Sequence, residues 1–267
     1  MMFKENNFMN WDNPGVALIT GASSGIGAEF ARQLASQGFD LILIARRKEK
    51  LKDISEKLTK THSINAEFLI TDLSKVPENQ MVIKRIAELD NIDILINNAG
   101  FGVWNTFLQT DISHYVDMVN VHFTSTVMLC HAVIPSMIKQ KRGVIINTSS
   151  MSAITRDPSL IMYTTTKSAI SIFSELLNKQ VKGKGIYIQS LHPGFTYSEF
   201  HDTSTMKGFQ RNWFPEERWM STEKVVSLSL GAVETNKVIF IPGELNQELA
   251  KQDRIKKEKK YLNCDIF

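Results

Sequence analysis

The sequence predicts an α/β protein built on a doubly wound parallel sheet with helices on both faces. Short apolar runs rich in Ile, Val and Leu recur along the chain, segments of helical spacing separate them, and a glycine-rich segment follows the first run. Such runs are typical of parallel strands covered on both faces. Their alternation with helices predicts right-handed crossovers. We find no internal repeat or composition shift, so residues 1–267 are expected to form a single domain.

The expected strands are short and mostly apolar. They lie at residues 17–20, 41–45, 67–71, 94–97, 144–148, 186–191 and 238–241. Between them, Leu51, Ile54 and Leu58 form one amphipathic helical face, and Val82, Ile86 and Leu89 form another. Ligands of such sheets bind beyond the carboxyl ends of the strands, so functional residues are expected there.

Composition and charge exclude several classes of protein. A formal charge of +3 is too small to indicate nucleic acid as the main partner, and no run reaches the roughly 18 apolar residues of a membrane span. The polar start MMFKENNFMNWDNPG does not resemble a secretory signal. Cys130 and Cys264 have no metal or redox spacing and suit a reducing compartment, so no metal and a cytoplasmic location are expected.

The C-terminal tail, residues 251–267, is the one basic segment that stands out. Lysines and an arginine cluster in KQDRIKKEKK at residues 251–260. We interpret this tail as a solvated helix end or a disordered segment rather than a binding patch.

The segment TGASSGIG, residues 20–27, follows the first strand and precedes the amphipathic segment Glu29–Gln37. Glycines allow a tight turn and let a diphosphate approach the main chain, while the next helix offers free N–H groups and the positive end of its dipole. This context predicts a nucleotide site. The segment lacks the G-K-[ST] ending of a phosphate loop, so ATP or GTP hydrolysis is not expected. The expected contacts are Gly21, Ser23, Ser24, Gly25, Ile26 and Gly27.

The end of the second strand indicates which dinucleotide is bound. An acidic residue there would hold the ribose hydroxyls of NAD, but the sequence reads Ala45-Arg46-Arg47. A cation at this place makes charge-assisted hydrogen bonds to a 2′-phosphate. We therefore expect NADP(H), with Arg46 as the main phosphate contact; the alternative is that both arginines only open a solvated helix.

Taken together, these features resemble the short-chain dehydrogenase/reductase family, in its simple single-domain branch. Six motifs occur in the family's order between about Gly15 and Gly243: TGASSGIG at 20–27, NNAG at 97–100, Asn120 in VDMVNVHF, NTSS at 147–150, YTTTK at 163–167 and PG at 193–194. The resemblance implies a Rossmann-type sheet of seven strands, in agreement with the strands above.

Tyr163 and Lys167 are four positions apart, which places them on one helix face. Lowering a tyrosine pKa from about 10 to neutrality requires about 4 kcal/mol, roughly what one ammonium about 4 Å away supplies at an effective dielectric near 20. By resemblance, Tyr163 is the general acid or base of a hydride transfer, Lys167 lowers its pKa and holds the nicotinamide ribose, and Ser150 binds the substrate oxygen. Asn120 would hold a proton-relay water, or simply kink a buried helix.

Further residues are implied by the resemblance alone. Asp72 would lie near the adenine amino group, and Asn98 and Gly100 would lie beneath the ribose. Pro193 and Gly194 form the later cofactor-side motif, and Thr196 would meet the carboxamide. His192 is expected to be structural.

Residues 195–221 form the segment that usually covers the substrate in this family, called here the covering segment. Its many aromatic residues suggest an apolar ketone, steroid-like alcohol or 3-oxoacyl chain, unless they pack the segment onto the core or form a subunit interface. Four basic or imidazole side chains, His201, Lys207, Arg211 and Arg218, would also allow an acidic group.

The sequence favours one of three possible functions. The expected one is an NADP(H)-dependent oxidoreductase that interconverts a ketone and a secondary alcohol. A sugar-nucleotide epimerase would have a different glycine spacing and a longer chain, and a catalytically silent NADP(H)-binding regulator or scaffold would have lost one of the four active groups. By analogy with the family, a homodimer or homotetramer formed through the long helices near 111–138 and 158–182 is expected.

Overall fold

The computed structural model describes residues 13–156 and 158–262. Two predictions fall outside the described residues. No secretory signal was expected in the N-terminal segment, most of which is not described, and the end of the basic tail with Cys264 is not described either. Within them, residues 251–262 form the last part of helix α9 (Glu244–Leu262).

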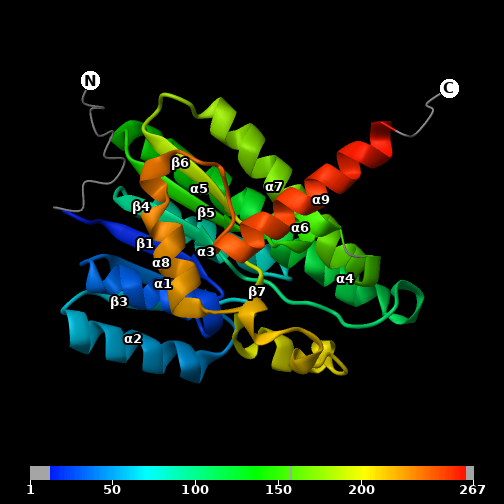
Figure 1. Ribbon diagram of the computed structural model, residues 1–267. Coiled ribbons are helices and arrows are strands. Elements are labelled where there is room, and N and C mark those ends of the chain that lie inside the picture. Colours follow the sequence, from blue (N-terminus) through cyan, green and yellow to red (C-terminus); the bar gives the residue numbers. More distant parts are fainter. Residues whose placement is uncertain (1–12, 157, 263–267) are drawn as a thin grey trace.

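Seven parallel strands form the main sheet in the order β3-β2-β1-β4-β5-β6-β9 (Figure 1). They are β1 (Val16–Thr20), β2 (Asp40–Ala45), β3 (Ala66–Ile70), β4 (Ile92–Asn97), β5 (Gly143–Thr148), β6 (Ile186–Leu191) and β9 (Ile239–Phe240). The predicted doubly wound, Rossmann-type sheet is confirmed, with each expected strand within two residues of its predicted bounds. The strand order reverses between β1 and β4, and ligands of such sheets bind at the carboxyl side of that point.

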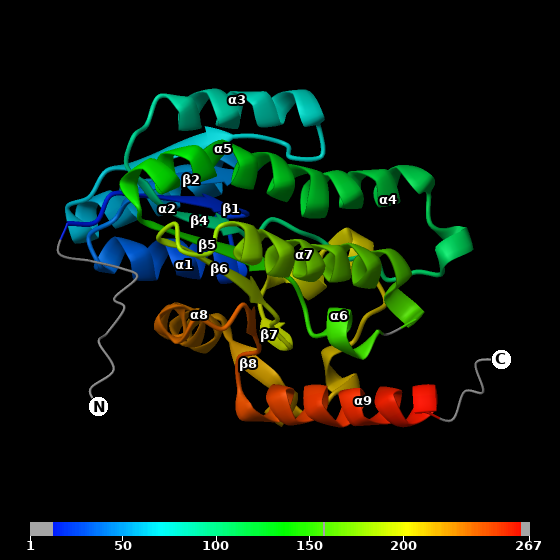
Figure 2. The same cartoon turned by 90° about the horizontal axis from the view of Figure 1, so that it is seen from above.

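Helices cover both faces of the sheet (Figure 2). One apolar core lies beneath α1 (Gly25–Ser36), α2 (Lys48–His62) and α8 (Thr222–Gly231). The other lies beneath α3 (Val76–Ala87), α5 (Ser125–Gln140) and α7 (Ile161–Gln180). Alternate residues of each strand enter opposite cores: Leu18 lies in the second, and Ala17 and Ile19 in the first. Burial of both faces explains why the strands are almost continuously apolar.

The long helix expected near 111–138 is interrupted. Helix α4 (Ile112–Val119) passes into a π-helical turn, Asn120–Thr124, before α5 begins. Next to this turn, the Ser125 hydroxyl donates to the Val121 carbonyl at 2.7 Å and the Thr126 hydroxyl to the His122 carbonyl at 2.7 Å. Such turns occur often at functional sites.

The helical run Ile112–Gln140 is long and apolar enough to cross a membrane by length and composition alone. In the fold this run packs against the sheet, with Leu129, Val133 and Met137 completely buried. Helix packing of this kind is found in core helices of α/β proteins. The absence of a membrane span stays a prediction.

The covering segment contains a structure that the sequence did not predict. Strands β7 (Phe195–Tyr197) and β8 (Trp219–Ser221) pair in parallel as a separate two-stranded sheet. The intervening residues form short 3₁₀ turns, of which the first is Glu199–Asp202. Because β7 and β8 are the first and last residues of the covering segment, their pairing brings its two ends together.

At the amino ends of the central strands, Asp93 at the start of β4 contacts residues that precede β1 and β5. Its carboxylate accepts the Gly15 N–H at 2.7 Å, next to β1, and two bonds from Arg142, next to β5, at 2.8 and 2.7 Å. The Asp93 side chain is 6% exposed. A bidentate arginine–carboxylate pair of this kind is strong and directional.

We predict that Asp93→Ala lowers the free energy of unfolding by about 3 kcal/mol, because it leaves the Arg142 guanidinium and the Gly15 N–H without their acceptor. Urea denaturation followed by circular dichroism would measure the change. The matched substitution at the exposed neighbour, Asp90→Ala, should stay within about 0.5 kcal/mol of the wild type. Equal losses in both variants would contradict the role given to Asp93.

Candidate functional site

The glycine segment joins β1 to α1 and presents main chain at the carboxyl edge of the sheet. Gly21 and Gly25 have φ values of +66° and +56°, in the left-handed region that favours glycine. A Cβ on Gly27 would lie 2.3 Å from the Gly21 carbonyl oxygen. Ser24 is the N-cap of α1, but its hydroxyl makes no capping bond among the described residues. The helix N-terminus therefore keeps N–H groups for an anion, and the segment fits a dinucleotide diphosphate.

The first two motifs of the sequence bind each other at the point where the strand order reverses. The Thr20 hydroxyl oxygen accepts the N–H groups of Asn98 at 2.9 Å and Ala99 at 3.0 Å, and the Asn98 side-chain amide donates to the Thr20 carbonyl at 3.3 Å. A Cβ on Gly21 would lie 2.9 Å from the Ala99 Cα. The loops after β1 and β4 therefore form one continuous surface for a ligand.

Arg47, rather than Arg46, contacts the glycine segment. Its Nε and Nη2 atoms lie 3.1 and 2.8 Å from the Ser23 hydroxyl, and Nη2 lies 2.7 Å from the Ser24 hydroxyl. Arg46 is exposed at the end of β2. Arg46 was the expected phosphate contact, and that stays a prediction; of the two arginines, Arg47 is the one that lies beside the glycine segment. From sequence alone, two adjacent arginines could not be distinguished.

Ser150, Tyr163 and Lys167 come together where β5 ends and α7 begins. The side chains of Ser150 and Tyr163 are hydrogen-bonded. The Lys167 ammonium donates to the Thr148 carbonyl at 2.7 Å and lies 5.7 Å from the centre of the Tyr163 ring. The neighbouring Ser149 hydroxyl instead donates to the Lys167 carbonyl at 2.7 Å, so of the two serines Ser150 is the one that meets the phenol.

Burial is the main influence on the protonation of the Tyr163 phenol and the Lys167 ammonium. Removal from water raises the pKa of Tyr163 to about 12, partly offset by the hydrogen bond with Ser150, and lowers the pKa of Lys167 to about 7. The lowering of the tyrosine pKa that was expected from the lysine is not seen, since only the hydrogen bond with Ser150 opposes the effect of burial. The physical reason is that the same burial that disfavours a phenolate also removes much of the charge from the ammonium.

His122 was not among the expected site residues. It accepts the Phe101 N–H at Nε2, at 3.0 Å, and its Nδ1 lies 2.8 Å from the Thr166 hydroxyl. Its ring meets the Tyr163 ring edge-on, with centres 5.6 Å apart. A Cβ on Gly100 would lie 3.0 Å from Nε2 and 3.3 Å from the Lys167 Nζ. His122 thus joins the loop after β4 to α7. The only signal in the sequence was its place two residues after Asn120.

The other expected residues occupy the same edge of the sheet. Asn120 opens the π-helical turn, and its side chain donates to the Ser74 carbonyl at 3.1 Å. Asp72 follows β3 and accepts the Ser74 N–H at 3.1 Å. Thr196 is buried and donates to the Gly194 carbonyl at 3.1 Å, while the Pro193 carbonyl accepts the Met151 N–H at 2.9 Å. Ile26 packs against the first apolar core.

His192 has the structural contacts that were expected of it. Its Nδ1 lies 3.0 Å from the Ser150 carbonyl oxygen, and its Nε2 lies 2.9 Å from the Ser190 hydroxyl. Burial lowers the pKa of His192 to about 4 and that of His122 well below its usual value, so both rings are neutral near pH 7.

Aromatic residues of the covering segment pack mainly on one another. Phe195 lies 4.2 Å from Phe214 and 5.1 Å from Trp219, measured between ring centres. One aromatic ring faces the site: Phe200 lies 5.8 Å from the Tyr163 ring. A Cβ on Gly102 would lie 2.8 Å from the Met206 sulfur and 3.1 Å from Phe200. The cluster therefore gives the segment a core of its own, and Phe200 forms its face toward Tyr163.

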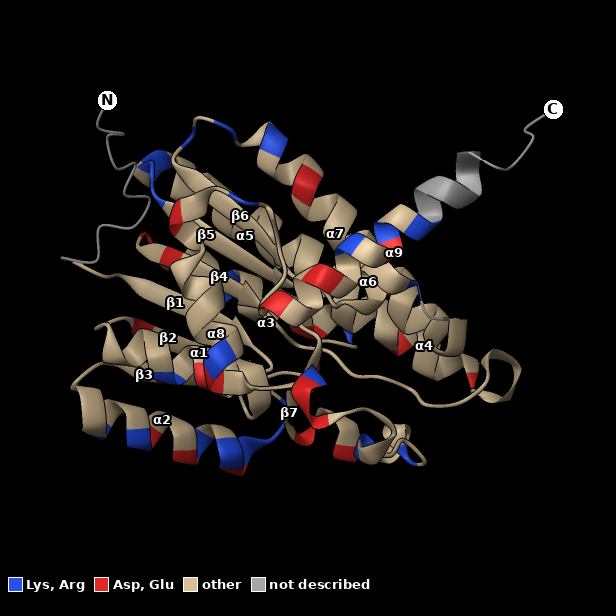
Figure 3. Cartoon of the chain, viewed as in Figure 1, with Lys and Arg blue, Asp and Glu red and all other residues tan. Residues whose placement is uncertain are grey.

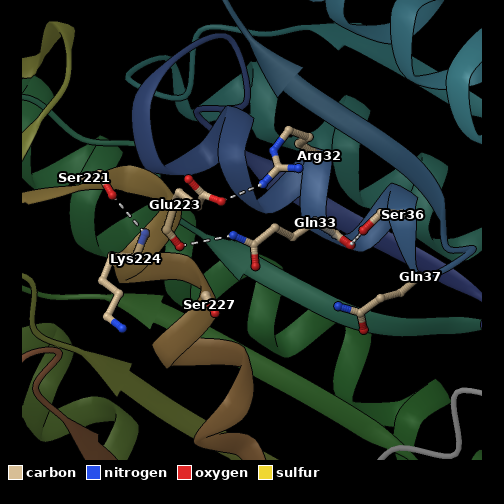
Figure 4. A pocket seen from close by; sticks show the side chains of 8 residues that line it. All are labelled: Arg32, Gln33, Ser36, Gln37, Ser221, Glu223, Lys224 and Ser227. Atoms are coloured by element: carbon tan, nitrogen blue, oxygen red, sulfur yellow. Dashed lines mark hydrogen bonds and ion pairs between the residues drawn. The ribbon is translucent and has the colours of Figure 1, made fainter.

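A polar hollow lies between α1 and the start of α8 and is lined by residues such as Gln33 and Lys224 (Figure 4). Its Arg32 is paired with Glu29 at 2.6 Å, and Gln33 donates to the Glu223 carbonyl at 3.2 Å. The Gln33 bond joins the two helices, whereas the Arg32–Glu29 pair lies within α1, and none of the residues expected to bind or react lines the hollow. We assign no function to it.

The buried histidines predict how stability depends on pH. Both titrate near 6.5 when unfolded, so below that pH the unfolded chain takes up protons that the folded chain refuses. The contribution of these two histidines to the free energy of unfolding is fully present above about pH 6.5. It is lost as the pH falls below that value, toward 4 for His192. Urea unfolding across this range should show a shallower dependence for His122→Asn, whereas the exposed His131→Gln should match the wild type. Equal slopes in all three proteins would contradict this account.

A family model for short chain dehydrogenases matches residues 15–207. Hydroxysteroid dehydrogenase-like protein 1 of Gallus gallus is 32% identical over 80% of this chain and 65% of its own length. Very-long-chain 3-oxoacyl-CoA reductase-A of Danio rerio is 37% identical over 67% of this chain and 57% of its own. Inactive hydroxysteroid dehydrogenase-like protein 1 of Homo sapiens is 31% identical over 66% and 54%. The chain spans between 54% and 65% of the length of these relatives.

Solved structures cover nearly the whole chain. A short-chain dehydrogenase from Sphingobium yanoikuyae in complex with NADPH has a TM-score of 0.82 and 30% identity, over 95% of this chain and 96% of its own. The bulky-bulky ketone specific alcohol dehydrogenase from Comamonas testosteroni has a TM-score of 0.76 and 27% identity over 95% and 96%. With the matched model, the sheet order and the motifs gathered at one edge of the sheet, these likenesses show that the chain belongs to the short-chain dehydrogenase family of oxidoreductases, whose members use nicotinamide cofactors.

Proposed function

We propose that the protein is an NADP(H)-dependent oxidoreductase that interconverts a ketone and a secondary alcohol on an apolar substrate. The observation that carries this proposal is the hydrogen-bonded pair Ser150–Tyr163, with Lys167 one helical turn away, at the sheet edge that also holds the glycine segment. The two hydroxyls converge where a carbonyl oxygen would be bound and protonated. This arrangement suits acid–base catalysis beside a dinucleotide.

Each residue has a separate task in this proposal. Burial keeps the Tyr163 phenol protonated, which is the form that a general acid needs when a ketone is reduced. The Ser150 hydroxyl donates to the substrate oxygen as negative charge develops on it. Lys167 holds the nicotinamide ribose, and Asn120 holds the water that resupplies the proton. The bound nicotinamide supplies or accepts the hydride.

The preference for NADP(H) is supported by the cations around the end of β2. Arg47 lies on the Ser23 and Ser24 hydroxyls, and Arg46 is its exposed neighbour. The sequence has no carboxylate at this strand end to hold the ribose of NAD. The relative from Sphingobium yanoikuyae was solved in complex with NADPH.

An apolar carbonyl compound is the substrate class that the surroundings of Tyr163 favour. Phe200 faces the phenol, and Met206, 2% exposed, packs beside the same stretch of chain. The names of two relatives refer to a 3-oxoacyl-CoA and to bulky ketones. Both compounds join a carbonyl group to apolar surface, which suits the apolar side chains beside Tyr163.

The second candidate is a catalytically silent NADP(H)-binding regulator or scaffold. One observation favours it: a human relative, 31% identical, has a name that describes it as inactive. Against it, this chain keeps Asn120, Ser150, Tyr163 and Lys167 at one sheet edge. Measured turnover separates the two candidates.

We also propose a homodimer or homotetramer that assembles through the long helices. On α7, Ile172 and Leu176 are each 58% exposed and lie four positions apart on one face. On α4, Ile112 and Val116 are 70% and 52% exposed with the same spacing. Exposed apolar faces of this kind are typical of subunit interfaces. The cytoplasm is the proposed location.

We predict that Tyr163→Phe lowers turnover at least about 100-fold, because it removes the proton donor and leaves the ring in place. The measurement is ketone-dependent NADPH oxidation, followed by absorbance over a panel of apolar ketones and 3-oxoacyl thioesters. NADPH binding, measured by fluorescence titration, should remain as in the wild type. Activity of the variant near the wild-type rate would remove Tyr163 from the mechanism, and no activity of the wild type with any ketone would favour the silent binder.

We predict that Arg47→Met weakens NADPH binding by roughly tenfold, since a charge-assisted bond to the phosphate is worth more than a neutral one. NADH binding should change little. The matched variant Arg46→Met should have the smaller effect, because Arg46 makes no contact with the serines that flank the expected phosphate. Isothermal titration with both cofactors would measure this, and a larger loss in Arg46→Met would restore Arg46 as the main contact.

A further inference from the structure

Glu199 of the covering segment forms ion pairs with Arg47, which is proposed to bind the cofactor phosphate, and with the neighbouring Lys50. Glu199, in the 3₁₀ turn directly after β7, accepts from Arg47 Nη1 at 2.6 Å and from Lys50 Nζ at 2.5 Å. Basic residues at the start of α2 lie beside acidic residues of the segment after β7 (Figure 3). These two pairs hold the pKa of Glu199 down to about 2, so the carboxylate is ionised at every working pH.

The Arg47 guanidinium donates both to neutral serine hydroxyls and to one charged carboxylate. Nε and Nη2 point to the Ser23 hydroxyl, Nη2 also reaches the Ser24 hydroxyl, and Nη1 points to Glu199. A serine hydroxyl can turn and donate to a phosphate oxygen, so both serines can stay when a phosphate arrives. An ionised carboxylate only accepts and is repelled by a second anion. Glu199 is therefore the ligand of Arg47 that a phosphate would displace.

Charge and exposure make such an exchange reasonable. The side chains of Arg47, Lys50 and Glu199 are 45%, 46% and 48% exposed, so each ion pair is weak. Without Glu199 the two cations carry two positive charges, and a phosphate monoester carries about two negative charges near pH 7. The dianion therefore balances the cations more completely than one carboxylate does.

We propose that the Glu199 carboxylate competes with the 2′-phosphate of NADP(H) for Arg47 and Lys50, and thereby couples phosphate binding to loss of the contact between the covering segment and α2. This inference rests on the proposed use of NADP(H). In this proposal Glu199 lies in the covering segment and does not itself bind the phosphate. It nevertheless affects the preference between NADP(H) and NAD(H).

Other contacts of the covering segment limit what is released. Arg211 donates to the Ser198 carbonyl at 2.9 Å and to Asp202 at 2.7 Å, and these bonds tie the turn after β7 to a later part of the same segment. The Ser198 Cβ lies 3.1 Å from the position that a Cβ on Gly25 would take, so β7 ends against the glycine segment. Release of Glu199 thus removes a bond to α2 and leaves the turn attached to its own segment.

The test is the variant Glu199→Gln, titrated calorimetrically with NADPH, NADH and 2′,5′-ADP, which carries the phosphate but no nicotinamide. Without the competing charge, NADPH and 2′,5′-ADP should bind roughly three- to tenfold more tightly, as expected for the loss of two weak ion pairs. NADH affinity should stay within about twofold. The control is Glu216→Gln, the same charge change at an exposed position of the covering segment, and it should match the wild type.

A second readout follows from the reciprocity of linked equilibria. Saturating 2′,5′-ADP should speed tryptic cleavage in the covering segment of the wild type, whereas Glu199→Gln should be cleaved faster without it and gain little on its addition. Unchanged or weaker NADPH binding by Glu199→Gln would overturn the competition, and a cleavage rate in the wild type that ignores 2′,5′-ADP would overturn the coupling. Wild-type protein that binds NADH as tightly as NADPH would instead overturn the proposed cofactor preference.

Discussion

The buried hydrogen bond from the Lys167 ammonium to the Thr148 carbonyl is the contact on which the site depends. It joins the carboxyl end of β5 to α7, and so sets the distance between Ser150, which follows the strand, and Tyr163, one turn earlier on the helix. The Ser149 hydroxyl repeats the same connection from the strand side. Since a buried ammonium needs a partner, the carbonyl both places and satisfies the lysine.

The protonation states of the site follow from where these groups lie. The Tyr163 phenol, Lys167 and the His122 imidazole are enclosed together, and the loss of water disfavours the charged form of each. Their mutual influence is weakened because none carries a full charge at neutral pH. The site of the isolated chain is therefore closer to a neutral hydrogen-bonding network than to an ion pair, and a charged ligand would alter all three groups together.

Charge is concentrated instead around the ends of β2 and β7. Arg47, Lys50 and Glu199 are partly exposed and come from segments about 150 residues apart in the sequence, as the separations of 152 and 149 positions show. Such pairs are weak and exchangeable, whereas the buried contacts around Lys167 are held by packing. One end of the sheet thus combines the buried contacts around Lys167 with a partly exposed ionic contact.

The sequence by itself determined the alternation of strands and helices, the end of the sheet at which the motifs meet, and the motifs TGASSGIG, NNAG, NTSS and YTTTK. These depend on periodicity and on local spacing along the chain. Only the tertiary structure decided that Arg47 rather than Arg46 reaches Ser23, that His122 touches Tyr163, that Glu199 lies on Arg47, and that most aromatic residues of the covering segment pack on one another. Each of these is a contact between side chains far apart in sequence or a choice between adjacent residues. Their outcome depends on rotamers, burial and three-dimensional packing, which a one-dimensional pattern does not encode.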